Sequence, residues 1–130
     1  MKEESKAPEG ILCSLTHEWL LEGEEYSTIG ITDIGIEQMG EIVLVDLPEV
    51  GSEFARGEVF GTIESIREAS EIYMPVSGKV IEINEELINS PEIINEDCFY
   101  QGWLIKIQSD TIQDDAVDLL EYEDYKEEVE

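Results

Sequence analysis

The sequence predicts a mainly β fold with short helices and a helix at the C-terminal end. Short segments rich in β-branched residues recur between turn residues, as the strands of a β protein do. The length of 130 residues and the hydrophobic content of 42% suffice for one compact core and are small for two. The acidic tail adds helical periodicity. The expected strands are residues 26–31, 42–47, 58–64, 71–74, 79–83 and 103–107.

Two short helices are expected between these strands. The first covers residues 34–39, where Thr32 or Asp33 can accept a backbone hydrogen bond as the N-cap. Gly40 can supply the left-handed residue that ends this helix. A weaker helical turn is expected at residues 85–88, just before a Ser-Pro pair.

The strands differ in how their faces should be buried. In residues 103–107 the large apolar side chains alternate with Lys106, which is typical of a half-buried strand. Ile81 and Ile83 are expected to face inward for the same reason. Residues 42–45 are apolar throughout, which predicts the most buried strand of the fold.

The tail is predicted to form a terminal amphipathic helix. Ala116, Leu119, Leu120 and Val129 recur near helical spacing and are surrounded by acids, so the segment has one apolar side. Acidic side chains at its far end lie against the negative pole of the helix dipole, which weakens the last turn. We expect the apolar side to pack on the rest of the domain.

The charge of the chain excludes several classes of partner. Lys and Arg total 7 against 33 for Asp and Glu, which gives a formal net charge of -26. Nucleic acid and anionic membrane surfaces would repel such a chain, so we expect basic or neutral protein partners. There is no apolar run long enough to span a bilayer, and neither a secretory nor a transit pattern follows Met1, which predicts a cytoplasmic protein.

The sequence contains no catalytic or metal-ligating motif. Cys13 and Cys98 are far apart without Cys-x-x-Cys spacing, and His17 is the only histidine, so no metal site is predicted. Both thiols are expected to be reduced, and the sequence leaves a disulfide between them open. His17 is assigned a structural role, and there is no nucleophile elbow or glycine-rich nucleotide loop. We therefore expect no catalytic residue and no enzymatic activity.

Several motifs in a fixed order resemble those of a known family. They are His17-Glu18-Trp19, Gly30-Ile31-Thr32-Asp33, Gly40-Glu41-Ile42-Val43, Asp46-Leu47-Pro48-Glu49-Val50-Gly51, Glu64-Ser65-Ile66-Arg67 and Gly102-Trp103-Leu104. Independent matches in sequence order are more specific than one short motif. Over roughly residues 15–126 the chain resembles the glycine cleavage system H protein family, whose members are lipoyl carrier proteins.

This resemblance implies a particular fold and domain organisation. The expected fold is the hybrid barrel-sandwich of lipoyl and biotinyl carriers, in which two antiparallel sheets present an attachment residue at a hairpin tip. Gly57 lies 10 residues before Arg67 and Gly78 lies 11 after it, which agrees with such a hairpin. Residues 1–14 are expected to be an N-terminal extension, and residues 15–130 a single domain that ends in the acidic helix.

Arg67 is the main departure from the family, where a lysine at this position carries the lipoyl group. Lipoylation forms an amide on a neutral amine, whereas a guanidinium stays protonated and offers only delocalised nitrogens. No cofactor is therefore expected on this chain, although Glu64, Ser65 and Ile66 keep the hairpin tip. The arginine could instead form an ion pair with a nearby acid, either Glu64, Glu68 or Glu71.

The resemblance also implies a pocket for the lipoyl arm. In the family, a hydroxyl residue, the glutamate of the His-Glu-Trp motif and an acid after the attachment position shield the aminomethyl group. The matching residues are Thr16, Glu18 and Glu71. Polar and acidic groups suit a bound amine through charge-assisted hydrogen bonds. The sequence leaves open that Glu18 and Glu71 are ordinary solvated acids at strand edges.

Two functions follow from these observations. The family's carrier takes an aminomethyl group from glycine decarboxylase to an aminomethyltransferase and is reoxidised by dihydrolipoamide dehydrogenase. With Arg67, we expect a non-lipoylated relative that docks proteins like these three, because losing the attachment point removes the carrier role and leaves docking possible. The alternative is an interaction or regulatory module that uses the same scaffold.

Overall fold

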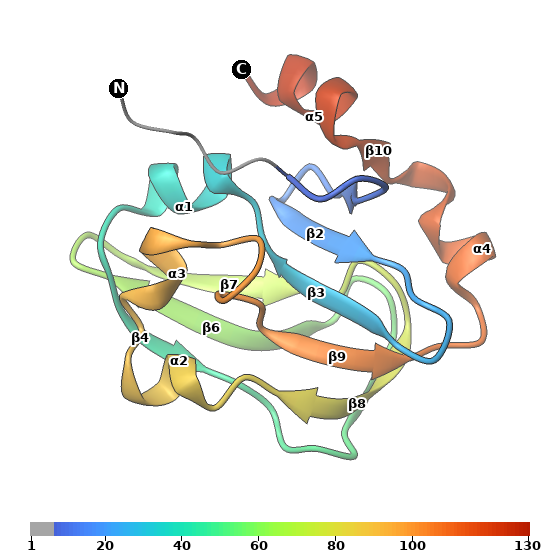
Figure 1. The fold of residues 1–130 in the computed structure, drawn as a ribbon, viewed down its shortest axis with the longest axis horizontal. Coiled ribbons are helices and arrows are strands. Elements are labelled where there is room, and N and C mark those ends of the chain that lie inside the picture. The colour runs from blue at the N-terminus through green and yellow to red at the C-terminus, as the bar shows by residue number, and fades with distance from the viewer. Residues whose placement is uncertain (1–6) are drawn as a thin grey trace.

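The computed structural model describes residues 7–130; residues 1–6 of the expected extension 1–14 lie outside the described residues. A seven-stranded antiparallel sheet has the order β10-β1-β2-β3-β9-β8-β5 within this range, and a second sheet has the order β4-β6-β7. Figure 1 shows α1 and α3 near each other and α5 beside β10. The expected mainly β class with short helices and a C-terminal helix is confirmed.

The elements have the following bounds. The larger sheet contains β1 Leu12–Cys13, β2 Glu18–Leu21, β3 Ser27–Ile31, β5 Glu53–Phe54, β8 Gly78–Ile83, β9 Ile105–Gln108 and β10 Leu120–Glu121. The smaller sheet contains β4 Ile42–Asp46, β6 Val59–Ser65 and β7 Ala69–Tyr73. The helices are α1 Asp33–Met39, α2 Glu86–Asn89, α3 Ile93–Glu96, α4 Ile112–Asp115, the 3-10 helix η1 Ala116–Asp118 and α5 Tyr122–Val129.

Helix α1 forms as its sequence predicts. Thr32 is the N-cap, and its Oγ1 accepts a hydrogen bond from the Gly35 amide at 3.1 Å. The helix ends at Gly40, whose φ of 89° is accessible to glycine without a Cβ penalty. Asn95 of α3 fixes the following link, because its amide donates to the Gly40 carbonyl at 3.0 Å and its Oδ1 accepts from the Ile42 amide at 2.9 Å.

The burial expected for β4 is wrong. Val43 and Leu44 are 49% and 45% exposed, although residues 42–45 are all apolar. β4 is an edge strand, and a bulge between Ile42 and Leu44 interrupts the alternation of its side chains. In β8 a bulge after Val80 similarly makes Val80, rather than Ile81, the fully buried residue.

The tail is a chain of short elements rather than one amphipathic helix. Leu120 pairs with Cys13 and Glu121 with Leu12, so this part of the tail is the edge strand β10. The helix that does form, α5, begins only at Tyr122. Pairing with β1 overrides the local helical periodicity because it completes backbone hydrogen bonds of the sheet.

The same pairing moves the expected domain boundary. Residues 12–13 form β1 between β2 and β10, and Ile11 and Cys13 are buried. The proposed division into an extension 1–14 and a domain 15–130 would therefore cut through packed structure. Residues 11–13 belong to the domain.

The core contains residues of both sheets and both cysteines. The Trp19 ring lies so close to Gly30 that a Cβ there would be 2.5 Å from it, which explains the glycine in the Gly-Ile-Thr-Asp motif. The indole donates to the Cys98 carbonyl at 3.2 Å. Cys13 and Cys98 are buried and free, and burial raises the pKa of both thiols to about 12.

Among residues 7–130, no helix has the length and apolar character needed to cross a membrane.

Two tyrosines attach α5 to the N-terminal end of α1. Tyr125 is fully buried, and its hydroxyl lies 2.5 Å from His17 Nδ1 and 2.6 Å from Thr32 Oγ1. The Tyr122 hydroxyl donates to the Asp33 carboxylate at 2.7 and 2.8 Å. The C-terminal helix is therefore held by buried polar contacts as well as by its apolar side.

Tyr125→Phe should destabilise the protein because it removes this hydroxyl and keeps the ring. The His17 ring and the Thr32 hydroxyl lose a buried partner, so we expect the free energy of unfolding to fall by about 1 kcal/mol in urea denaturation. Tyr26→Phe is the matched control, since Tyr26 is 41% exposed; it should change stability by less than about 0.5 kcal/mol. Equal losses in the two variants would contradict the anchoring role.

Candidate functional site

The hairpin of β6 and β7 ends in an exposed and well-fixed tip. The Ser65 hydroxyl accepts hydrogen bonds from the amides of Arg67 at 3.1 Å and Glu68 at 3.2 Å. The Ser65 amide also donates to the Glu68 carbonyl at 2.8 Å, which closes the turn. Ile66 is 67% exposed, and its amide donates to the Glu41 carbonyl at 3.0 Å, which ties the tip to the start of β4.

Arg67 lies against the C-terminal end of α1. Its Nη1 donates to the Gln38 carbonyl at 3.4 Å, and a Cβ on Gly40 would be 2.9 Å from Nη2. α1 has no basic residue in its own last turn, so the guanidinium provides the positive charge that the negative pole of the helix favours. The sequence left open an ion pair of Arg67 with Glu64, Glu68 or Glu71. Within residues 7–130, Arg67 forms no ion pair with any of these acids.

Glu18 is buried beside the expected arm pocket. It is 1% exposed; its Oε1 accepts from the Ser14 hydroxyl at 2.6 Å and from the Thr16 hydroxyl, and its Oε2 accepts from the Tyr73 amide at 3.1 Å. Burial raises the pKa of Glu18, and these hydrogen bonds partly oppose that rise. Glu18 is therefore not an ordinary solvated strand-edge acid. The sequence did not lead us to predict that Ser14 contacts Glu18. Its position four residues before Glu18 was the only signal of this contact.

Glu71 is separate from this buried carboxylate. It is exposed on β7, and its carboxylate accepts from the Tyr73 hydroxyl at 3.3 Å. Cross-strand pairs place Glu71 opposite Thr62, and Glu64 opposite Ala69, so Glu64 and Glu71 lie on the same face of the hairpin. The structure thus joins Thr16 to the Glu18 carboxylate, whereas Glu71 is an exposed residue on the same hairpin face as Glu64.

A mostly apolar cleft of about 370 Å³ opens next to Glu18. Leu15, Met74, Pro75 and Leu119 line it together with Tyr73. Arg67 does not line this cleft. β7 separates Arg67 from Tyr73, and its five residues span about 13 Å at the usual rise of a strand.

Polar contacts hold the tail along one wall of the cleft. Arg56 Nη1 donates to the Asp115 carbonyl at 3.0 Å and lies 3.5 Å from the Asp118 carboxylate. The Ser77 amide donates to the Asp115 carboxylate at 2.8 Å, and this bond is the main cause of a lowered pKa for Asp115. The cleft is therefore bounded by fixed loops on this side.

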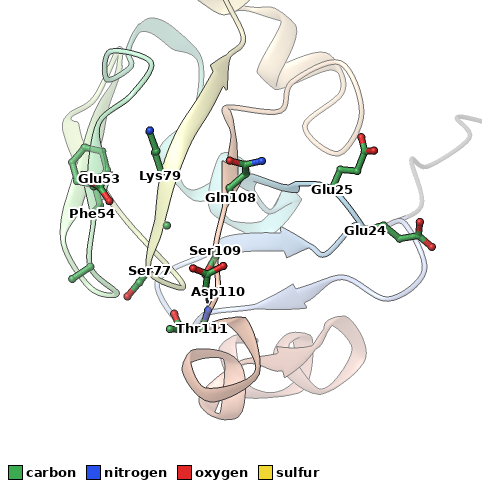
Figure 2. Close-up of a pocket in the computed structure, with 12 residues that line it drawn as sticks. Glu24, Glu25, Glu53, Phe54, Ser77, Lys79, Gln108, Ser109, Asp110 and Thr111 are labelled. Carbon is green, nitrogen blue, oxygen red and sulfur yellow. Dashed lines mark hydrogen bonds between the residues drawn. The ribbon is translucent and has the colours of Figure 1, made fainter.

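A larger hollow lies elsewhere on the described surface and is acidic. It has a volume of about 820 Å³, and its lining includes Glu24, Glu53, Lys79 and Asp110. Figure 2 shows these side chains spread around the opening rather than directed at one point. Within residues 7–130 there is also no group of three His, Cys, Asp or Glu side chains that could hold a metal ion.

His17 takes the structural role assigned to it. Its φ of 79° is the only positive value at a non-glycine residue in the described chain, and its ring faces Tyr125. Burial lowers the pKa of His17, and a contact with the Gln38 side chain partly opposes this. The neutral ring is thus favoured next to the buried hydroxyl.

A family model described as "Glycine cleavage H-protein" matches residues 12–130. The chain belongs to this family. It is 43% identical over 122 residues to the glycine cleavage system H protein of Carboxydothermus hydrogenoformans, which covers 94% of this chain and 93% of the relative. It is 51% identical over 104 residues to that of Alkaliphilus oremlandii, covering 79% of this chain and 80% of the relative.

A solved structure of the glycine cleavage system H protein from Mycobacterium marinum has the same fold. The TM-score is 0.84 at 29% identity, and the match covers 93% of this chain and 97% of that chain. The family and the hybrid barrel-sandwich expected from the sequence are therefore confirmed. Arg67, the residue expected from the sequence at the attachment position, has no neutral amine that a lipoyl group could acylate.

The pKa of His17 should lie below its ordinary value of about 6.5. The folded state then binds fewer protons than the unfolded state just below this pH, so the contribution of His17 to stability is complete above it and falls as the pH drops toward the folded pKa. NMR can follow the ring directly, because it is the sole histidine.

His17→Asn provides the matched comparison, since asparagine tolerates a positive φ and does not titrate. Between about pH 7.5 and pH 5.5, the wild type should lose stability relative to this variant. A pH-independent difference, or an NMR pKa at or above the ordinary value, would contradict the account.

Proposed function

We propose that this chain is an H-family protein that docks the partners of a lipoyl carrier without carrying a lipoyl group at position 67. One observation supports this most directly: the Arg67 guanidinium contacts the C-terminal end of α1, where a carrier needs a free amine on a mobile arm. A tethered arm acts by reaching successive sites, and this side chain is short, charged and held. The protein has no cofactor and no enzymatic activity of its own in this proposal.

The features that support docking are those that do not depend on lysine. The tip is exposed, the turn is closed by Ser65, and Glu64 and Glu71 share one face of the hairpin. Of the three positions that match the family's arm pocket, Thr16 and Glu18 line the cleft, and Glu71, which does not line it, is assigned to the hairpin face with Glu64. The partners we propose are proteins similar to aminomethyltransferase, glycine decarboxylase and dihydrolipoamide dehydrogenase. If none of them binds, an interaction or regulatory module on the same scaffold becomes the better explanation.

Incubation with lipoate ligase, lipoate and ATP should leave the wild-type mass unchanged, because the guanidinium stays protonated. Arg67→Lys should gain a lipoyl group on the hairpin peptide, since Glu64, Ser65 and Ala69 still form a family-like turn. Intact mass and peptide mapping measure both results. An adduct on wild-type Arg67, or on Lys79, would contradict the proposal.

Arg67→Lys should also change stability by less than about 0.5 kcal/mol, as most exposed substitutions do. If this variant folds and remains unmodified, Glu68 is the next cause to test, because the family favours alanine there. Failure of Arg67→Lys with Glu68→Ala to become lipoylated would show that the tip is no longer recognised as a carrier hairpin.

Docking to an aminomethyltransferase-like protein should slow steeply as salt rises. Electrostatic steering mainly sets the association rate and is screened over about 8 Å at physiological ionic strength. Glu64→Lys with Glu71→Lys should slow association in stopped-flow measurements. Glu127→Lys with Glu128→Lys on α5 changes the charge equally and is the control. Equal effects of the two pairs, or no binding at low salt, would overturn docking through the hairpin face.

A further inference from the structure

A second surface that could bind a partner lies beside the hairpin tip, between β4 and α3. It is a groove of about 580 Å³, whose lining includes the apolar residues Val43 and Pro91 and the acids Glu41, Glu92 and Glu96. We call it the β4 groove. The amide of Ile66 is bonded to the carbonyl of Glu41, so the groove opens directly next to the tip. It is separate from the cleft at Glu18.

Val43, the exposed aliphatic residue in the wall of the groove, lies within the β-bulge of β4. The bulge between Ile42 and Leu44 leaves two consecutive aliphatic side chains, Val43 and Leu44, about half exposed on an edge strand. Exposed aliphatic residues on an edge strand promote association, and bulges commonly redirect side chains near functional sites. The neighbouring Ile66 extends the exposed apolar surface at the tip.

The floor of the groove is held in place by hydrogen bonds. Asn95 lines it, and its Oδ1 accepts from the Ile42 amide at 2.9 Å while its Nδ2 donates to the Gly40 carbonyl at 3.0 Å. One of these backbone groups ends α1 and the other begins β4, so Asn95 fixes the link between the two elements. The surface is therefore formed in the free chain, which reduces the ordering required for binding.

The charges around the groove are of one sign. No basic side chain lines it among the described residues. Arg67 contacts the C-terminal end of α1, and Lys79 on β8 lines the acidic hollow of about 820 Å³ instead. The other described basic side chains form ion pairs elsewhere: Arg56 with Asp118, Lys106 with Glu82 and Lys126 with Glu123.

We propose that the β4 groove binds a segment of a partner protein in which an aliphatic side chain is flanked by lysine or arginine. The aliphatic side chain packs on Val43 and Pro91, and the flanking cations face Glu41, Glu92 and Glu96. A second copy of this chain is disfavoured as the occupant, because each copy carries a net charge of -26. The surface does not include position 67, so the inference goes beyond the proposed loss of the lipoyl arm.

The test uses the full chain labelled with 15N and a short synthetic peptide that has leucines flanked by lysines. At low salt, amide shift changes should concentrate at residues 41–44, 66 and 92–96. Two control peptides separate the contributions: one replaces leucine by serine and the other replaces lysine by glutamate. Both should bind much more weakly, because the groove requires the apolar anchor and the cations together.

Variants of the chain locate the site independently. Val43→Ser should weaken peptide binding about tenfold, as expected for losing the burial of one aliphatic side chain. Glu92→Lys with Glu96→Lys should weaken it and reduce its salt dependence. The controls are Val117→Ser, at a side chain that is 72% exposed on η1, and Glu127→Lys with Glu128→Lys on α5.

The proposal would be overturned by shift changes spread over the whole surface, by equal weakening in the control variants, or by no binding at low salt. Sedimentation that reveals dimers which Val43→Ser dissociates would also overturn it, by assigning the groove to a second copy. This experiment requires neither lipoylation nor an aminomethyltransferase. Its outcome is therefore distinguishable from failure of the proposed docking through the hairpin face.

Discussion

The polar groups at the two ends of α1 are the constraint that links the distant parts of this protein. The first amides and the last carbonyls of a helix have no partners within the helix. At the N-terminal end, Thr32 caps α1 and also contacts Tyr125 of α5, so the C-terminal helix is attached there. At the other end, the exposed Gln38 carbonyl accepts from Arg67, so the hairpin tip is attached as well. One short helix thus contacts both the tail and the tip.

The buried acid Glu18 and the acids of the surface lie in different electrostatic environments. The one buried carboxylate of this site, Glu18, is surrounded by three hydrogen-bond donors, which partly offset the unfavourable desolvation of its charge. The remaining acids are largely exposed and produce the net charge of -26. Such a surface resists self-association, and it leaves the aliphatic residues of β4 accessible to a partner of opposite charge.

Much of the fold could be predicted because local signals agree with the final structure. The cap at Thr32, the stop at Gly40 and the alternation around Lys106 all specify elements that form. Residues 42–45 and the tail were mispredicted for the opposite reason. A bulge exposes Val43 and Leu44, and pairing with β1 makes Leu120 part of a strand. The bulge and the pairing both depend on strands that are distant in sequence.

Some features of the candidate site could likewise be predicted from the sequence, and others could not. The order of the motifs predicts the hairpin and places Thr16 beside Glu18, because both follow from family-like spacing. The position of the Arg67 side chain could not be predicted, since α1 and the hairpin tip are separated by about thirty residues and nearby acids offered a simpler partner. The contribution of Ser14 to the environment of Glu18 likewise depends on a turn that the sequence does not specify.

We propose that position 67 holds a static contact instead of a carrier arm in the living cell. Intact mass spectrometry of the protein purified from its native cells tests this most directly, because it detects any acyl group whatever enzyme attached it. The account predicts the mass of the unmodified chain under conditions in which lipoylated proteins of the same cells are fully loaded. A lipoyl mass increment on the native protein would contradict it.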